Sequence, residues 1–399
     1  MSAPRKVALI AFGIILGLSL GWVILRLLDS GAAPLDTACQ PAPGDWEAQT
    51  RALLHDYRVP CDTFYWLPDP GGEFHTQVRL NNYGLHAPDY TLAKAPGVFR
   101  IVIVGDSFPQ GMQVEVEQTF PQLLQERLNR DRAQTIEVIN LSMDAYGTDR
   151  ELLLYALIGW QFDPDLVLLS VYAGNDMQDN HIELEQRRYG YRLERPFFTL
   201  GDAGLQLHNS PIFTPDAYDS PVFRWLAGMQ AAQAPPPPEN PPPQPAVFSE
   251  NPYEVAYPVQ IGLYLPEDAY WREAWALTEA LLMQFRDVVE TAGGVPFGVL
   301  LIPDRRAVYP AIWGSEVSRY TEMLPDLRQA DPMQPTTRLE TLLGERGIPV
   351  LNLAWTLRAQ ADSIDEPLYY AGDGHFTPSG HLVVAQRIAL WLPAAGLVP

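Results

Sequence analysis

Five residues of this chain have the types and the order needed for acyl transfer by a serine nucleophile. Ser107, Gly147 and Asn175 each follow a short apolar segment, and Asp373 and His375 precede the last amphipathic segment. A serine hydroxyl is a weak nucleophile at neutral pH, so a base must take its proton. His375 is the candidate base, and Asp373 would orient the imidazole and stabilise its protonated form.

The tetrahedral oxyanion of such a reaction needs hydrogen-bond donors aimed at it. The backbone N–H groups of Ser107 and Gly147 and the side-chain amide of Asn175 are the candidate donors. Removal of one such donor typically costs about 3 kcal/mol of barrier. Each residue alone is equally typical of a turn or a helix cap. Their order along the chain is what favours a catalytic interpretation.

The segments between these residues predict alternating strands and helices. Such alternation indicates a parallel sheet covered by helices on both faces, with its active site at the carboxyl ends of the strands. Thr119 and Thr148 are expected to cap their helices, with Glu151 completing a capping box. The predicted strands are Phe99–Val104, Thr135–Leu141, Leu166–Val171, Val295–Ile302 and Ile348–Leu353, and the predicted helices are Thr119–Asn129, Thr148–Phe162, Asp268–Thr291, Thr336–Arg346 and Pro378–Leu392.

The alternation fails between about residues 181 and 266, which we interpret as an insertion. Its first part, Arg195–Leu207, resembles a hairpin with a turn near Gly201. Its second part contains the proline-rich tract Ala231–Pro245, which can form neither helix nor sheet and is expected to be extended or irregular. This tract is typical of a surface loop, and a ligand for a proline-recognition domain is the alternative.

The N-terminus predicts a membrane anchor. Val7–Leu25 is uncharged and has about the length of a membrane-spanning helix, and Arg5 and Lys6 precede it. The positive-inside rule then leaves the N-terminus in the cytoplasm and the remaining chain outside. A cleaved signal peptide is the alternative. The expected organisation is an anchor over residues 1–28, a stalk and lead-in over 29–97, and a catalytic domain over 98–399.

Composition excludes some partners and cofactors. The net charge of −21 disfavours nucleic acid, which requires a basic surface. The chain has two cysteines, Cys39 and Cys61, which is too few for a cysteine-based zinc site. In an exported segment this pair predicts one disulfide, and two unpaired thiols are the alternative. We expect no metal and no cofactor.

Four segments in this order resemble the blocks of the SGNH/GDSL hydrolase superfamily. Ile103–Phe108 is similar to its serine block, Asp144–Gly147 to its glycine block, Gly174–Asp176 to its asparagine block and Asp373–His381 to its histidine block. The resemblance implies a three-layer α/β/α sandwich with a parallel, flavodoxin-like sheet, interrupted here by the proline-rich insertion. It also implies a Ser107–His375–Asp373 triad with an oxyanion hole at Ser107, Gly147 and Asn175.

One feature departs from many members of that family. The acid precedes the histidine by two positions instead of three, as in relatives that O-acetylate polysaccharides, which leaves the orienting role of Asp373 open. His381 is expected to pack or cap the last helix. Arg305 and Arg306 are interpreted as surface charge or as contacts to an anionic substrate. Phe108, beside the nucleophile, favours short acyl groups.

These residues are compatible with three functions. The first is an ester hydrolase acting on acyl esters, including esters of carbohydrates, outside the cytoplasmic membrane. The second is an O-acyltransferase with the same triad, which would need a membrane partner to deliver acyl groups. The third is a non-catalytic module that binds carbohydrate or assists assembly. Retention of Ser107, Asn175 and His375 favours the two catalytic functions.

Overall fold

A computed structural model of the protein describes residues 64–68, 71–130, 133–190, 195–208, 257–292 and 294–399. The predicted anchor Val7–Leu25, the cysteine pair Cys39 and Cys61, and the proline-rich tract Ala231–Pro245 lie outside these residues. Within them, no helix has both the length and the apolar character needed to cross a membrane. Nor do these residues contain a cluster of His, Cys, Asp or Glu side chains suited to a metal ion.

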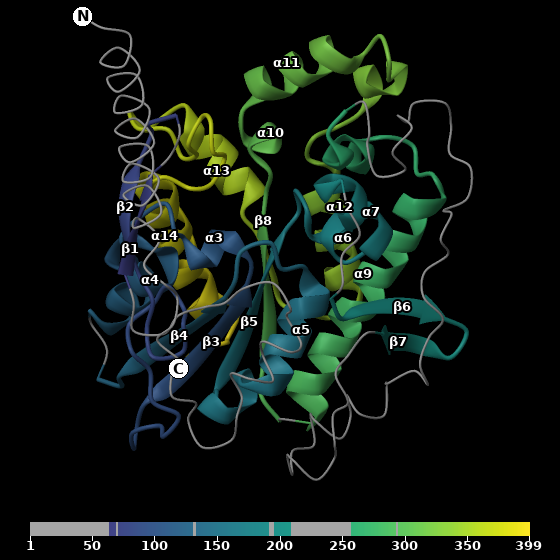
Figure 1. Cartoon of the computed structure of the whole chain (residues 1–399). Helices are drawn as coiled ribbons and strands as arrows, with labels where there is room; N and C mark the ends of the chain where they lie inside the picture. The colour runs from purple at the N-terminus through teal and green to yellow at the C-terminus, as the bar shows by residue number, and fades with distance from the viewer. Residues whose placement is uncertain (1–63, 69–70, 131–132, 191–194, 209–256, 293) are drawn as a thin grey trace, which may run out of the picture. The chain divides into compact units, whose positions relative to one another are not determined.

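A five-stranded parallel sheet forms the centre of the fold (Figure 1). Of the five strands, the one that comes first in the sequence lies between the second and the third, which is the order of flavodoxin-like sheets. The predicted strands and the predicted sheet type are therefore confirmed. In spatial order the strands are β4 (Ile136–Ser142), β3 (Phe99–Gly105), β5 (Leu166–Tyr172), β8 (Phe297–Ile302) and β9 (Val350–Asn352).

The side chains of each central strand alternate between two apolar cores. In β3, Val102 and Val104 belong to one core, and Ile101 and Ile103 belong to the other. Helices cover the sheet on both faces and make the three-layer α/β/α arrangement that was expected (Figure 1). The helices that line the first core include α5 (Thr148–Leu157), α9 (Ala269–Asp287) and α12 (Gln334–Glu345), and those that line the second include α4 (Phe120–Asn129), α13 (Ala354–Ala361) and α14 (Pro378–Ala394).

Shorter elements lie around the sheet, and two antiparallel hairpins are among them. The hairpin predicted within the insertion is confirmed as β6 and β7. These elements are β1 (Phe64–Pro68), β2 (His75–Arg79), α3 (Ser107–Gln110), η1 (Val116–Gln118), η2 (Gly159–Phe162), α6 (Asp176–Asp179), α7 (Ile182–Tyr189), β6 (Phe197–Gly201), β7 (Gly204–His208), η4 (Val259–Tyr264), η5 (Val288–Ala292), α10 (Arg305–Val308), α11 (Pro310–Tyr320) and η6 (Pro325–Gln329).

The capping box expected for α5 was wrong, whereas Thr119 is the N-cap residue of α4 as expected. Helix α5 begins after Gly147, and Thr148 is its first residue instead of its cap. The side chain of Asn180, from a different loop, accepts the hydrogen bond of the Asp149 N–H. Glu151 is fully buried and completes no capping box. The hydroxyl of Thr119 donates to the Val116 carbonyl, so Thr119 stands at the N-cap of α4 without a side-chain capping hydrogen bond.

Candidate active site

Ser107 lies where strand β3 turns into the short helix α3, at the carboxyl end of the sheet (Figure 1). Gly105 is required at this turn, because a Cβ atom there would lie 2.5 Å from Pro109 and 2.9 Å from Ser170. The carboxylate of Asp106 caps α3 by accepting a hydrogen bond from the Phe108 N–H. Ser107 is the first residue of α3, where a backbone N–H has no acceptor within the helix. That N–H is therefore suited to bind an oxyanion.

The three predicted catalytic side chains form a continuous hydrogen-bonded chain. His375 Nε2 lies 2.8 Å from Ser107 Oγ, and His375 Nδ1 lies 2.7 Å from Asp373 Oδ1. An ionised carboxylate can only accept, so Nδ1 carries the proton and donates to Asp373. Nε2 is then the free base that accepts the proton of the Ser107 hydroxyl. This is the geometry needed to activate a serine.

The two-residue spacing between acid and base is made possible by a tight turn. Gly374, between Asp373 and His375, has a φ of 92°, a conformation that glycine adopts at little cost. Asp373 Oδ1 accepts a hydrogen bond from the His375 backbone N–H at 3.1 Å as well as the one from the ring. The backbone contact fixes the carboxylate beside the imidazole. The orienting role of Asp373, which the short spacing left open, is therefore consistent with this geometry.

The electrostatics of the pair raise the pKa of His375. Burial lowers the pKa of His375, but the hydrogen bond and the charge of Asp373, with the charges of Asp106 and Asp144, outweigh burial and raise it. Burial raises the pKa of Asp373, but the hydrogen bonds and charge of His375 lower it overall. Burial raises the pKa of Asp106 to about 7. The imidazolium that forms during catalysis is thus stabilised.

Gln113 also contacts the triad. Its Nε2 lies 3.1 Å from His375 Nδ1, but that nitrogen already donates its proton to Asp373 and cannot accept another. The Gln113 amide instead donates to Asp373 and contributes to the lowered pKa of that carboxyl. Gln113 is held in turn by Thr76 of β2, whose hydroxyl donates to the Gln113 carbonyl at 2.7 Å.

The other two oxyanion candidates lie in loops that follow β4 and β5. Gly147 precedes α5, and a Cβ atom there would lie 2.7 Å from Asn180 Oδ1, so a larger residue would displace the Asn180 loop. Asn175 precedes α6 and is only 7% exposed. Its Nδ2 donates to Asp179 at 2.8 Å, which uses one of its two N–H groups. The second N–H remains a candidate oxyanion donor.

A carboxylate from the lead-in holds the turn that carries the acid and the base. Glu73 accepts hydrogen bonds from three successive backbone N–H groups, those of Ala371, Gly372 and Asp373, at 2.8, 2.8 and 3.1 Å. On the same turn, the Arg305 guanidinium donates to the carbonyls of Tyr370 and Ala371. Arg305 was interpreted as surface charge or a substrate contact, and its observed role is to hold this turn.

Three further expectations concern residues beside the triad. His381 is structural, as expected, because burial lowers its pKa to about 3 and its Nδ1 accepts a hydrogen bond from the Phe120 N–H. Arg306 is paired internally with Asp304. Phe108 is 2% exposed and its ring packs 5.1 Å from the His375 ring, so it supports the base and gives no reason to expect short acyl groups.

Several residues that hold the site were missed by sequence reasoning. Glu73, Gln113, Asp179 and Arg188 contact the catalytic side chains or the loops that carry them. Glu73 and Gln113 act on partners more than 250 positions away in the chain, so no local pattern indicates their role. Asp179 lies four positions after Asn175, a helical spacing that provides the one usable signal.

Comparison with solved structures returns proteins of similar fold. They include a GDSL-like lipase from Bacteroides thetaiotaomicron, with 12% identity over 74% of this chain and 88% of that chain and a TM-score of 0.33. A lipase/acylhydrolase from Enterococcus faecalis has 12% identity over 74% of this chain and 96% of that chain, with a TM-score of 0.37. The psychrotrophic esterase EstA from a Pseudoalteromonas species has 11% identity over 74% of this chain and 97% of that chain, with a TM-score of 0.35.

The identities and TM-scores of these three matches are low. No protein-family model matches the sequence, and no curated protein matches it either. The chemistry proposed below therefore depends on the geometry of Ser107, His375 and Asp373.

Replacement of the acid tests its electrostatic role. In Asp373→Asn, we expect kcat/KM for p-nitrophenyl acetate to fall by up to about 10⁴-fold. Loss of the carboxylate charge also lowers the pKa of His375, so the acid limb of the pH profile should move to lower pH. The exposed Asp362→Asn is the matched control and should leave both quantities unchanged. An acid limb that stays in place, or moves to higher pH, would contradict this role of Asp373.

Replacement of Glu73 tests whether the lead-in holds the catalytic turn. Glu73→Ala removes the acceptor for three backbone donors, and a misplacement of about 1 Å can cost up to about 10²-fold in rate. The donors are exposed to water, so the unfolding free energy should fall by only about 1 kcal/mol. We expect kcat/KM to fall far more than the melting temperature does. Glu117→Ala, on the neighbouring exposed surface, is the control, and equal kcat/KM in the two variants would exclude the proposed clamp.

Proposed function

We propose that this protein is a serine-dependent hydrolase of acyl esters that works through an acyl-enzyme on Ser107. The observation that carries the proposal is the continuous chain from Ser107 Oγ through His375 to Asp373, with separations of 2.8 and 2.7 Å. A hydroxyl at a strand-to-helix turn, a base within hydrogen-bond reach and an acid behind the base are the parts that activate a serine.

The reaction follows from this arrangement in two steps. Ser107 Oγ attacks the ester carbonyl while His375 Nε2 takes the hydroxyl proton, and the carbonyl oxygen becomes an oxyanion. Collapse of this intermediate breaks the bond to the leaving alcohol, and the imidazolium returns the proton to that alcohol. Water then attacks the acyl-enzyme with His375 as base, which releases the acid and restores Ser107.

A second candidate function uses the same acyl-enzyme. If a sugar hydroxyl replaces water in the second step, the protein is an O-acyltransferase that modifies an extracytoplasmic polysaccharide. The two-residue spacing of Asp373 and His375 favours this candidate, because it resembles relatives that O-acetylate polysaccharides. A transferase would depend on a membrane partner that supplies acyl groups. A non-catalytic role is disfavoured, because a binding module would have no need of a complete hydrogen-bonded triad.

We further propose that the catalytic domain works outside the cytoplasmic membrane, anchored by Val7–Leu25 behind Arg5 and Lys6. In spheroplasts that express the full chain, added protease should digest the domain, and the protein should fractionate with membranes. A soluble product that begins near Ala32 would show a cleaved signal instead. Mass spectrometry of non-reduced peptides from the same preparation tests the proposed Cys39–Cys61 disulfide, which free thiols at both positions would exclude.

Covalent labelling tests the nucleophile. A fluorophosphonate probe should label Ser107, and Ser107→Ala should abolish both labelling and turnover of p-nitrophenyl esters. His375→Ala should reduce both by several orders of magnitude, because the hydroxyl then lacks its base. Asn175→Ala should lower kcat by roughly 10²–10³-fold with the labelling site intact. Addition of oligosaccharide acceptors to the wild-type assay separates transfer from hydrolysis. Unchanged turnover in Ser107→Ala would overturn the assignment.

A further inference from the structure

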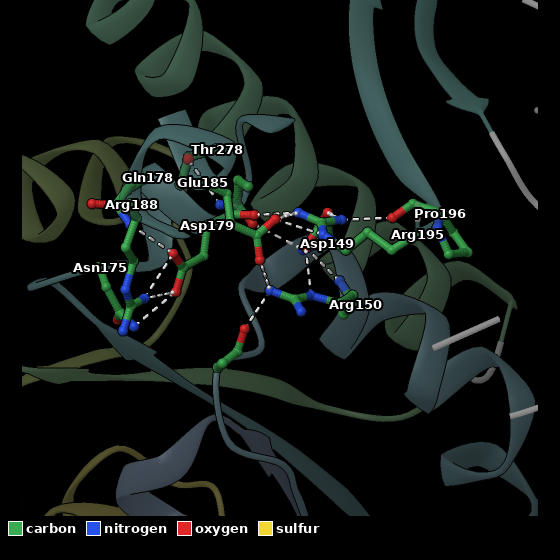
Figure 2. Close-up of polar contacts among 12 residues, drawn as sticks. Asp149, Arg150, Asn175, Gln178, Asp179, Glu185, Arg188, Arg195, Pro196 and Thr278 are labelled. Carbon is green, nitrogen blue, oxygen red and sulfur yellow. Dashed lines mark hydrogen bonds and ion pairs between the residues drawn. The ribbon is translucent and has the colours of Figure 1, made fainter. Parts of the chain in front are cut away.

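We propose that Asp179 and Arg188 are positioning residues that fix the orientation of the Asn175 amide in the oxyanion hole. The inference rests on the proposed function and adds to it. It makes the beginning of the insertion, where Arg188 lies on α7, part of the catalytic apparatus. Figure 2 shows Asn175 and Arg188 both directed at the carboxylate of Asp179.

The contact between Asn175 and Asp179 determines whether the nitrogen or the oxygen of the Asn175 amide faces Asp179. Asn175 Nδ2 lies 2.8 Å from Asp179 Oδ2. An ionised carboxylate accepts hydrogen bonds and donates none, so it selects the nitrogen of the amide and repels its oxygen. One N–H of Asn175 is thereby committed to Asp179, and the other keeps the direction that it needs to donate to an oxyanion.

A rotated amide would do more harm than a missing one. If the amide turned by 180°, its carbonyl oxygen would replace the N–H and would repel the negative charge that develops on the substrate. The amide oxygen does not prevent this rotation. Asn175 Oδ1 is buried and makes no hydrogen bond among the described residues, so no hydrogen bond to the oxygen would be lost. The Asp179 carboxylate is thus the group that distinguishes the two orientations.

Asp179 can select the amide nitrogen only while its carboxyl group is ionised, and its buried surroundings disfavour the ionised form. Its side chain is fully buried, and burial raises the pKa of a carboxyl group. The main opposing group is Arg188, whose NH1 contacts both Asp179 oxygens, at 3.0 and 2.8 Å. The pKa of Asp179 stays raised overall, and the Arg188 charge and its two contacts favour the ionised form that accepts from the N–H of Asn175.

The same network reaches the loop that carries Gly147. Arg195 donates to the Asp179 carbonyl at 2.6 Å and to the Asp149 carboxylate at 2.7 Å, and Asp149 is the second residue of α5 (Figure 2). Arg150 in turn donates to the Ala145 carbonyl, two residues before Gly147. Three arginines face three carboxylates in this buried network, so its charges balance: Arg150, Arg188 and Arg195 with Asp149, Asp179 and Glu185.

Arg188 is the residue to change, because its side chain is 29% exposed while those of Asp179 and Asp149 are fully buried. We would measure kcat, KM and the melting temperature of Arg188→Met, of Asn175→Ala and of the double variant on one p-nitrophenyl ester. Arg188→Lys tests rescue, since one NH1 makes both contacts and an ammonium can replace it. Arg188→Gln, a milder change, serves if Arg188→Met fails to fold.

Arg187→Met is the matched control. Arg187 lies beside Arg188 on the same helix, is buried, and packs its guanidinium 4.0 Å from the centre of the Tyr270 ring. This change should lower the melting temperature with little change in kcat. A purely structural role for Arg188 would give the same pattern in Arg188→Met.

A positioning role predicts a different result. Arg188→Met should lower kcat by a factor that approaches the roughly 10²–10³ expected for loss of an oxyanion donor, with KM nearly unchanged. The fold loss should largely vanish in the Asn175→Ala background, because the amide to be oriented is gone. Arg188→Lys should recover most of kcat. The proposal would be overturned if the kcat loss of the double variant equalled the product of the losses in Arg188→Met and Asn175→Ala.

Failure of this proposal can be told from failure of the proposed function. If Ser107 is not the nucleophile, fluorophosphonate labelling of the wild type and turnover in Ser107→Ala reveal it before any change at Arg188. If Ser107 is the nucleophile and the kcat losses of Arg188→Met and Asn175→Ala multiply in the double variant, the hydrolase assignment stands and the positioning role is excluded.

Discussion

Asp373 Oδ1 accepts two hydrogen bonds from one residue, the backbone N–H and the ring Nδ1–H of His375. The backbone bond fixes where the carboxylate lies, and the ring bond then fixes the tautomer and direction of the imidazole. Gly374 permits this turn, Glu73 and Arg305 hold it from outside, and Gln113 supports the acid. The base can serve Ser107 only while this arrangement persists.

The oxyanion side of the site follows the same logic with different groups. There a buried carboxylate, Asp179, selects the nitrogen of the Asn175 amide, as Asp373 selects the tautomer of His375. Both cases use an acceptor-only group to decide which polar atom faces the substrate. The difference is burial, since the Asp373 side chain is 22% exposed while Asp179 is fully buried and requires the charge of Arg188.

The central strands and the sheet type could be predicted because their signals are local, whereas the candidate triad was predicted from the order of its residues along the chain. Phe99–Val104 is a short run rich in β-branched residues, the pattern that strands buried on both faces of a parallel sheet show, and it forms β3. The cap of α5 could not be predicted in the same way. Thr148 and Glu151 have the spacing of a capping box, but the structure buries both and uses Asn180 from another loop. Glu73 and Arg188 act through partners that folding brings near, and no pattern in their own neighbourhood indicates that role.

The Glu73 clamp also has a consequence for the order in which the site is completed. Glu73 and its three donors are separated by 298 to 300 positions, and Ser107 and His375 by 268 positions. The entropic cost of closing a loop grows only with the logarithm of its length, so contacts between such distant residues cost little more than contacts between nearer ones. During synthesis, however, Ser107 and Glu73 are made long before the turn that carries Asp373 and His375. A nascent chain that stops short of residue 375 has its serine but no base, so under the proposed mechanism Ser107 stays unreactive until His375 has been synthesised.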